Sequence, residues 1–554
     1  MPTELQSPKP LILERIVRLR SLVILRSSHK MLSKLVSYFQ FKRDTPGALT
    51  WMSLGPDKNS GNALMVQFFT WDSVHPDMSW WMHFQREVPQ LAELGVTQVW
   101  LPPPNKASSN TGQGYDAYDL WDLGEFHQKG TINTRWGSKD ELLSAIAVAK
   151  QHGIDVLIDA VLNHKVGADR IETFDAIPVD NANRLREIGP IRQIEGWTAF
   201  DFSGRSGKYS KLCWNNEHFT GIDWDHRTQK RGVYKIVRKV RKGWSPNVDN
   251  ELGNYDYLLG ADVDFRHPDV QEDMANWSEW ILRTTGGSGF RLDAIKHIDR
   301  KFLLQWIKQV RRRDGRSRAF MVAEYWSAEL ARLLPWVHAF QGQTTFFDVP
   351  LHDNFHRASK GPFDLRCILD KTLLKTRPYD AVTFVDNHDT QIGQSLESWV
   401  DASFKLQAYS LILLRGGGHP CVFYGDLYQN GECYNESVAQ GLRLLLRARK
   451  DFAYGSSQDY FEHPSCIGFV RLGDASRSGC VVLISNDNQK QKARISVEPS
   501  HSIRMKVGEH DFNTEYIGLL EPHKIVKTTA DGWGTFTCRP GSLEVWIPHI
   551  PAAR

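Results

Sequence analysis

The sequence predicts an α/β protein built on a (β/α)8 TIM barrel, with a lobe inserted after the third strand and a C-terminal antiparallel β-sandwich. Short apolar runs rich in β-branched and aromatic residues alternate with helical segments, which is the pattern of parallel βα units. Eight such units indicate a closed barrel. The predicted strands are 63–69, 97–101, 155–159, 289–293, 320–324, 344–349, 381–386 and 421–424.

The segment 139–151 illustrates the helices between these strands. Leu142, Leu143, Ile146 and Ala149 recur at helical spacing, and Gly153 ends the pattern. The segment therefore predicts an amphipathic helix that packs one face on the barrel.

Two stretches interrupt or follow the βα pattern. The first, after the third strand, is long, aromatic and rich in turn residues, so it predicts a lobe of its own rather than a structureless loop. The second begins after about residue 455, where alternating apolar runs predict a β-sandwich. The expected organisation is a basic N-terminal extension (1–55), the first part of the barrel (56–164), an inserted calcium-binding lobe (165–257), the second part of the barrel (258–455) and the sandwich (456–554).

Composition restricts the possible functions. The chain has 554 residues, 41% of them hydrophobic and 24% charged, which is typical of a soluble globular protein with a large core. A formal charge of +4 is small for this length, so it argues against nucleic-acid binding and suits a neutral substrate. No stretch approaches the roughly 18 apolar residues of a membrane span.

The cysteines and the first 43 residues bear on location. Seven widely spaced cysteines without a CxxC pair do not suggest a disulfide framework. The first 43 residues hold nine Lys or Arg against two Glu, and arginines interrupt every candidate signal core. This segment is a solvated basic helix, a helix for a membrane surface or organelle, or an over-extended start before Met31. We expect a cytoplasmic protein with seven free thiols, and a monomer.

Polar residues end several of the predicted strands. In a parallel barrel the carboxyl ends of the strands face the active site, so these residues are expected to gather there. The candidates are Asp159, Asn163 and His164 after the third strand, Arg291, Asp293, Lys296 and His297 after the fourth, Glu324 after the fifth, Asp386, His388 and Asp389 after the seventh, and Tyr115 after the second.

Around these residues the chain closely resembles the α-amylase family of glycoside hydrolases, in particular its liquefying-type branch, which includes intracellular fungal enzymes. The resemblance covers nearly the whole chain from Ala63 onward. It is carried by the segments ALMVQFFTW from Ala63, GYDAYDLWDLGEF from Gly114, NYDYLLGADVD from Asn254, VFYGD from Val422 and ADGWGTF from Ala530.

The resemblance implies hydrolysis of internal α-1,4 bonds in starch-like or glycogen-like glucans. Asp293 resembles the family's nucleophile, Glu324 its general acid/base and Asp389 its third carboxylate. A retaining glycosidase needs two carboxyls about 5 to 5.5 Å apart. We expect Arg291 to keep Asp293 anionic, and Asp293 and Asp389 to keep Glu324 protonated. The implied substrate contacts are Tyr115, His164, Arg291, Lys296, His297 and His388.

The resemblance also implies a bound calcium ion. Asn163, Asp256, Asp262 and the backbone carbonyl of His297 match the family's calcium ligands, and calcium prefers such oxygen donors. The same residues could instead form Asx turns. A further metal cluster of some liquefying members is not expected, because Ser245 follows Trp244 where an acidic residue is required.

Two other functions stay open at this point. The covalent intermediate could be intercepted by a sugar hydroxyl, which would make the protein a 4-α-glucanotransferase. The fold also hosts non-catalytic glucan-binding proteins. Those lack the catalytic carboxylates, all of which this chain has.

Overall fold

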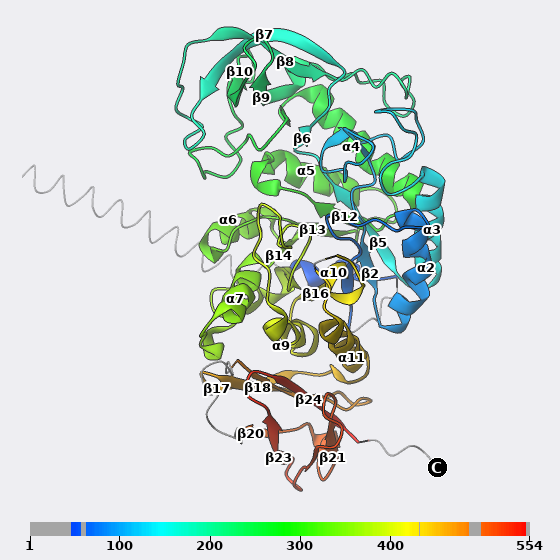
Figure 1. Cartoon of the computed structure of the whole chain (residues 1–554), viewed down its shortest axis with the longest axis vertical. Coiled ribbons are helices and arrows are strands. Elements are labelled where there is room, and N and C mark those ends of the chain that lie inside the picture. Colours follow the sequence, from blue (N-terminus) through cyan, green and yellow to red (C-terminus); the bar gives the residue numbers. More distant parts are fainter. Residues whose placement is uncertain (1–45, 57–61, 432, 487–499, 550–554) are drawn as a thin grey trace, which may run out of the picture. The chain divides into compact units, whose positions relative to one another are not determined.

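The centre of the fold is a closed barrel of eight parallel strands (Figure 1). The computed structural model describes residues 46–56, 62–431, 433–486 and 500–549, so the predicted basic segment 1–43 lies outside the described residues. Each predicted strand overlaps one strand of the barrel. Around the barrel these are β1 (Met65–Gln67), β2 (Gln98–Trp100), β5 (Asp155–Ala160), β12 (Gly289–Leu292), β13 (Phe320–Ala323), β14 (Thr345–Phe347), β15 (Ala381–Phe384) and β16 (His419–Phe423), which pairs with β1 again.

A helix follows each barrel strand along the chain. The predicted helix 139–151 is present as α3 with the same ends, because Ser138 and Glu141 form a capping box at its start. Ala145 is buried in α3 and Leu143 is half-buried, so the buried face is turned slightly from the predicted one. The others are α2 (Trp80–Glu93), α4 (Pro268–Thr285), α5 (Arg300–Arg311), α6 (Leu330–Phe340), α7 (Val349–Lys360), α9 (Ala402–Leu414) and α11 (Glu436–Phe452). Short helices α8 (Leu373–Thr376) and α10 (Tyr424–Leu427) add to this set.

The inserted lobe is a six-stranded antiparallel sheet with the order β6-β11-β9-β10-β7-β8. Its strands are β6 (His164–Lys165), β7 (Arg170–Val179), β8 (Arg192–Ala199), β9 (Phe219–Asp225), β10 (Lys230–Ile236) and β11 (Ala261–Val263). Strand β11 lies beyond the predicted end of the lobe at 257, because its three residues pair with β6 and β9 rather than with the barrel.

The C-terminal region consists of antiparallel sheets, as predicted. One has the order β17-β18-β19-β24-β21-β22, and β20 pairs with β23 in a second. Residues from both sheets, including Val470, Met505 and Phe536, share a buried apolar cluster. The strands are β17 (Ser457–His463), β18 (Cys466–Arg471), β19 (Cys480–Ser485), β20 (His501–Lys506), β21 (Glu515–Gly518), β22 (Ile525–Lys527), β23 (Trp533–Cys538) and β24 (Leu543–Pro548).

The barrel unit begins earlier than the predicted boundary at residue 56. The chain is compact from Gly47 onward. Ala48 is fully buried, and its backbone N–H donates to Asp380 at 2.9 Å. Residues 47–55 thus pack on the barrel through a buried side chain that a composition argument does not reveal.

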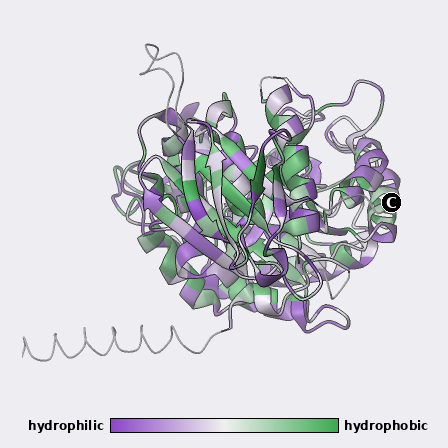
Figure 2. Ribbon diagram, turned by 90° about the horizontal axis from the view of Figure 1, so that it is seen from below, coloured by the Kyte–Doolittle hydropathy of each residue, from purple (hydrophilic) through white to green (hydrophobic). Residues whose placement is uncertain are grey.

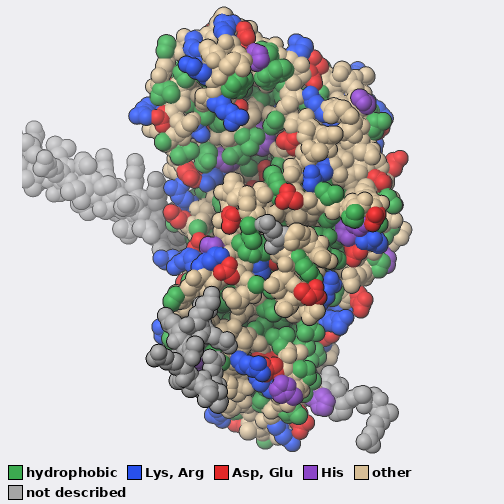
Figure 3. Space-filling model, viewed as in Figure 1, with side chains coloured by type: hydrophobic (Ala, Val, Ile, Leu, Met, Phe, Trp, Pro, Cys, Tyr) green, Lys and Arg blue, Asp and Glu red, His purple; other side chains and the backbone are tan. Residues whose placement is uncertain are grey.

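The surface is mixed in polarity. Outer helices carry both hydrophobic and hydrophilic residues, as amphipathic helices do (Figure 2). On the face drawn in Figure 3, acidic and basic side chains are interspersed. None of the described helices combines the length and apolarity needed to cross a membrane.

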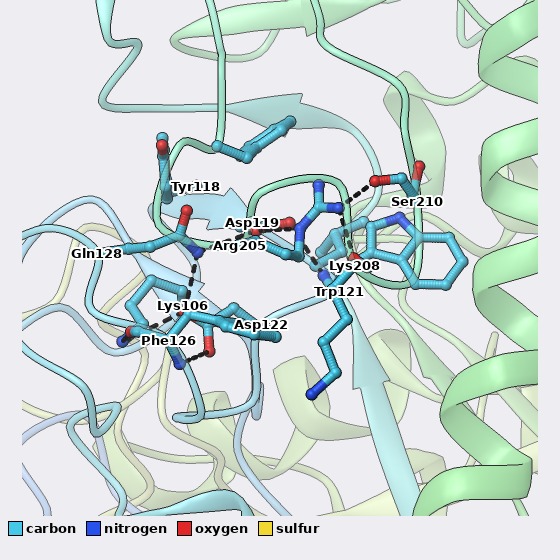
Figure 4. Close-up of polar contacts among 12 residues, drawn as sticks. Lys106, Tyr118, Asp119, Trp121, Asp122, Phe126, Gln128, Arg205, Lys208 and Ser210 are labelled. Atoms are coloured by element: carbon cyan, nitrogen blue, oxygen red, sulfur yellow. Dashed lines mark hydrogen bonds and ion pairs between the residues drawn. The ribbon is translucent and has the colours of Figure 1, made fainter.

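A buried network of charges ties the lobe to the loop after β2 (Figure 4). Arg205 of the lobe donates to Asp119 at 2.8 Å, and Gln128 donates to both Asp119 and Asp122. Lys106 lies 3.4 Å from Asp122 and donates to the carbonyls of 126, 131, 132 and 133. Because these groups are almost fully buried, each charge depends on its partner.

We predict that Arg205→Met destabilises the protein by about 3 to 5 kcal/mol, because it leaves the buried carboxylate of Asp119 without its cation. Thermal or urea unfolding measures this change. The matched control is Arg170→Met, which removes an exposed ion pair with Asp201 in the same lobe. Equal unfolding midpoints for the two variants would contradict a structural role for the buried network.

Candidate active site

Side chains at the carboxyl ends of β5, β12 and β13 meet around one arginine. Arg291 is fully buried and donates to Asp159 at 2.9 Å, to Asp293 at 2.5 Å and to Glu324 at 3.2 Å. Its guanidinium also lies 4.8 Å from the ring centre of Trp100. Neighbouring positions of three parallel strands thus bring three carboxyls to one cation.

Asp293 and Glu324 each use one carboxyl oxygen for these contacts. Arg291 binds Oδ1 of Asp293, while Oε2 of Glu324 accepts from Arg291 and from the backbone N–H of Ala294 at 2.8 Å. Ala294 has a left-handed backbone with φ of 48°. For a residue with a side chain this costs about 1 to 2 kcal/mol, a strain of the kind found at functional sites.

The protonation of Glu324 has a different main cause from the one expected. Burial is the largest influence and raises its pKa, Arg291 lowers it, and repulsion by Asp293 raises it again. The sequence argument attributed this shift to neighbouring negative charges alone. Desolvation is stronger because Glu324 lies deep in the barrel mouth, where water does not stabilise its charged form.

Asp389 lies on a turn that buried polar groups hold after β15. Asn387 accepts from the backbone N–H groups of Asp389 and Thr390, and Lys405 pairs with Asp386 at 2.8 Å. Burial and the charge of Glu324 raise the pKa of Asp389. A carboxyl in this position can hold a proton or donate it to a ligand.

Aromatic and imidazole rings lie beside these carboxyls: Tyr115 and Trp71 are half-buried, and His388 and His164 are buried. Tyr115 stacks on His388 with 4.9 Å between ring centres and on Trp71 with 5.7 Å. Nδ1 of His164 is buried without a hydrogen-bond partner, while Nε2 contacts the carbonyl of Tyr115 at 2.8 Å. His164 therefore has an unused polar atom for a ligand.

Two further residues belong to this site: Asp159, a strand-end candidate to which the sequence assigned no role, and Trp71, which the sequence did not identify. Asp159 accepts from Tyr115 at 2.7 Å, from Trp100 at 2.9 Å and from Arg291. Trp71 is held by Gln391, whose side chain accepts its backbone N–H at 2.9 Å. The strand-end rule identified Asp159, whereas no local pattern marks Trp71.

Lys296 and His297 lie where the barrel meets the lobe. Lys296 pairs with Glu251 at 2.6 Å and donates to the carbonyl of Trp326 at 3.0 Å. His297 contacts the carbonyl of Tyr255 through Nδ1 at 2.7 Å. Both side chains thus connect the end of β12 to the segment that precedes β11.

The expected calcium ligands are close together and deeply buried. Asn163 lies between β5 and β6, and its side chain donates to Asp262 of β11 at 3.3 Å. Its Oδ1 atom is buried without a partner. Burial raises the pKa of Asp256 to about 7, and burial together with Asp256 raises that of Asp262. An orphaned oxygen beside two buried carboxyls fits a hard divalent cation.

The sequence predicts no further metal cluster near Trp244 and Ser245, and the side chain of Arg266 lies at this place. Arg266 binds both oxygens of Asp264, at 2.7 and 3.2 Å, and donates to the carbonyls of 241, 242, 243 and 244. Its guanidinium already gives these oxygens a positive partner. This arrangement is consistent with Ser245 standing in place of an acidic ligand.

One other group of potential metal ligands occurs among the described residues, formed by His218, His267 and Asp269. Nδ1 of each histidine accepts a backbone N–H, from Asn215 at 3.0 Å and from Asp269 at 3.2 Å. A neutral imidazole that accepts at Nδ1 carries its proton at Nε2, so neither ring offers a free lone pair there. The group does not suit a metal ion in this form.

Comparisons with known proteins agree with this geometry. The family described as "Alpha amylase, catalytic domain" matches residues 85–440. An α-amylase of Geobacillus stearothermophilus is 42% identical over 88% of this chain and 87% of its own length. The cytoplasmic α-amylase of Escherichia coli (strain K12) is 39% identical over 88% and 99%.

Solved structures agree at the level of the fold. The acarbose complex of the α-amylase from Geobacillus thermoleovorans superimposes with a TM-score of 0.58 at 17% identity, over 89% of this chain and 99% of that one. The family match, the two relatives and the closed barrel show that the chain belongs to the α-amylase family of glycoside hydrolases.

Proposed function

We propose that the protein hydrolyses internal α-1,4 bonds of starch-like or glycogen-like glucans by a retaining double displacement. The observation that carries this proposal is the way Arg291 and Ala294 hold Asp293 and Glu324. One oxygen of each carboxyl is fixed by hydrogen bonds, and the other, Oδ2 or Oε1, has none from these groups. A nucleophile and a proton donor each need such a free oxygen.

In the first step, Oδ2 of Asp293 attacks the anomeric carbon and forms a glycosyl ester. The bond to the leaving glucan breaks, and Glu324 transfers its proton to the departing oxygen. Glu324 is suited to this step because burial favours its protonated form. Arg291 pairs with Oδ1 of Asp293 at 2.5 Å and so orients the attacking carboxyl.

In the second step, Glu324 removes a proton from water as the water oxygen attacks the anomeric carbon. The ester bond breaks and Asp293 returns to its carboxylate form, so the two inversions retain the anomeric configuration. We assign Asp389 and His388 to contacts with sugar hydroxyls, Tyr115 to the sugar face, and His164, Lys296 and His297 to the walls of the cleft.

The lobe offers a further apolar surface for a long glucan. A pocket of about 430 Å3 is lined by Lys165, next to His164, and by Trp197 and Trp224. The indole of Trp197 is 43% exposed, which is unusual for so large an apolar group. Flat, exposed rings suit the apolar faces of neutral sugars and support a polymeric substrate. The maltohexaose-forming relative of Bacillus sp. (strain 707), a glucan 1,4-α-maltohexaosidase, is 39% identical over 88% of this chain.

We assign calcium to Asn163, Asp256, Asp262 and the carbonyl of His297. The ion would supply the positive charge that these buried oxygens lack. The ligands come from the barrel and from the segment leading into β11, so the bound ion would stabilise the boundary that shapes the cleft.

Location in the cytoplasm is part of the proposal. All seven cysteines are free in the structure, although Sγ of Cys466 and Cys538 lie only 3.9 Å apart. Reduced thiols are typical of the cytosol. Thiol titration of the denatured, unreduced protein from cells is expected to find seven groups, and five would place the protein in an oxidising compartment.

We predict that Asp293→Asn abolishes nearly all hydrolysis of starch, with the loss exceeding about a thousandfold, because an amide cannot form the ester. Initial rates and the lengths of products from an end-labelled maltooligosaccharide measure this. Asp451→Asn, at an exposed position, is the matched control. A variant that keeps a tenth of the rate refutes the assignment, and products longer than the substrate would assign glucan transfer instead.

Removal of calcium by a strong chelator is expected to lower the unfolding temperature and the activity together, since two buried carboxylates lose their cation. Calcium restores both, whereas magnesium does not, because it demands a smaller and more regular shell. Asn163→Leu should make the unfolding temperature insensitive to the chelator. Unchanged unfolding of the wild-type protein in chelator is the outcome that would remove this site.

A further inference from the structure

The end of α5 and the turn between α5 and β13 concentrate positive charge. Residues 308–318 contain one acidic residue, Asp314, and six basic ones, which are Lys308, Arg311, Arg312, Arg313, Arg316 and Arg318. Arg311 donates to the carbonyls of Ala319 and Gln343, and Arg318 to that of Trp51. The charges of these two side chains are therefore stabilised by backbone carbonyls of the protein itself.

The remaining charge is poorly compensated. Arg313 pairs with Glu279 of α4 at 2.9 Å. Lys308, Arg312 and Arg316 form no ion pair within the part of the chain that the structure describes. Three cations therefore share one neighbourhood with two acids, Asp314 and Glu279, and Glu279 is already paired with Arg313.

These arginines line a pocket rather than a flat surface. The pocket has a volume of about 300 Å3 and lies between α4, the end of α5 and the turn. Its donors are Gln309, Arg312, Arg313 and Arg316, while Ala275 and Val310 contribute apolar wall. Ser278 and Glu279 of α4 also line it. A second pocket of about 400 Å3, lined in part by Lys308, borders the other side of Arg312.

Arg316 brings an unsatisfied hydrogen-bond donor to this pocket. Its Nη1 atom is enclosed and has no hydrogen-bond partner. Burial lowers the pKa of Arg316, and the negative charge of Glu279 offsets this effect only in part. A guanidinium is a planar fork that matches the oxygens of a phosphate, and it is the side chain best suited to binding one.

We propose that this pocket binds the phosphoryl group of a small phosphate monoester, such as a sugar phosphate. Arg312 and Arg316 form no ion pair among the described residues, and Glu279, the carboxylate that lines the pocket, is paired with Arg313. The pocket therefore carries an excess of positive charge, which suits a phosphate. The enclosed volume favours a small ester over an extended polyanion. Residues of this pocket precede β13, and Glu324 follows that strand, so the site lies at the opposite end of the barrel from the catalytic carboxyls.

Isothermal titration of the full protein with glucose 6-phosphate, inorganic phosphate and glucose at constant ionic strength tests the proposal. Both phosphates are expected to bind saturably and glucose is not. Arg316→Gln, and Arg312→Gln at an exposed position, should each weaken binding at least severalfold, and the double variant more than tenfold. The matched control is Arg447→Gln, an exposed change on α11. Any heat that arises because phosphate withdraws calcium from the protein will appear equally in this control.

Hydrolysis of starch should be unchanged in the arginine variants, because neither residue contacts the catalytic carboxyls. The proposal is overturned if the wild-type protein shows no saturable heat with either phosphate, or if the double variant binds as tightly as the control. Binding to vesicles that contain phosphatidylinositol phosphate, without binding to soluble esters, would also overturn it.

Discussion

The active site depends on one buried charge, the guanidinium of Arg291. Three carboxyls at the ends of adjacent strands would repel one another strongly in a region without water. Arg291 lies among them, contacts all three and packs on Trp100, so it makes their proximity possible. The same contacts orient the oxygens of Asp293 and Glu324, so the stability of the site and its proposed catalysis rest on one set of hydrogen bonds.

The second constraint is the attachment of the lobe to the barrel. Arg205 with Asp119, Lys296 with Glu251, and the oxygens around Asn163 all cross this boundary. Each contact buries polar groups that are costly when unpaired. These contacts therefore fix the position of the lobe on the barrel, and with it the walls of the proposed cleft.

In three places in this chain, the positive charge of arginine side chains needs a negative or polar partner. Arg291 balances carboxyls inside the barrel, and Arg266 balances Asp264 and a row of carbonyls in the lobe. At the opposite end of the barrel, Arg312 and Arg316 form no ion pair with any described residue. In the first two places the charge is satisfied within the protein, and the contrast is what makes the third place a site for an external anion.

The sequence by itself determined the barrel, the antiparallel C-terminal region and the strand ends that bear Asp293, Glu324 and Asp389. These features repeat with the period of strands and helices or stand at fixed places in motifs, so they can be read locally. Only the tertiary structure decided that residues 47–55 pack on the barrel, that β11 closes the lobe sheet, and that Trp71 joins Tyr115 and His388. It also decided that burial, more than repulsion, raises the pKa of Glu324. Such features depend on contacts between residues far apart in the chain and on the exclusion of water, neither of which leaves a local pattern in the sequence.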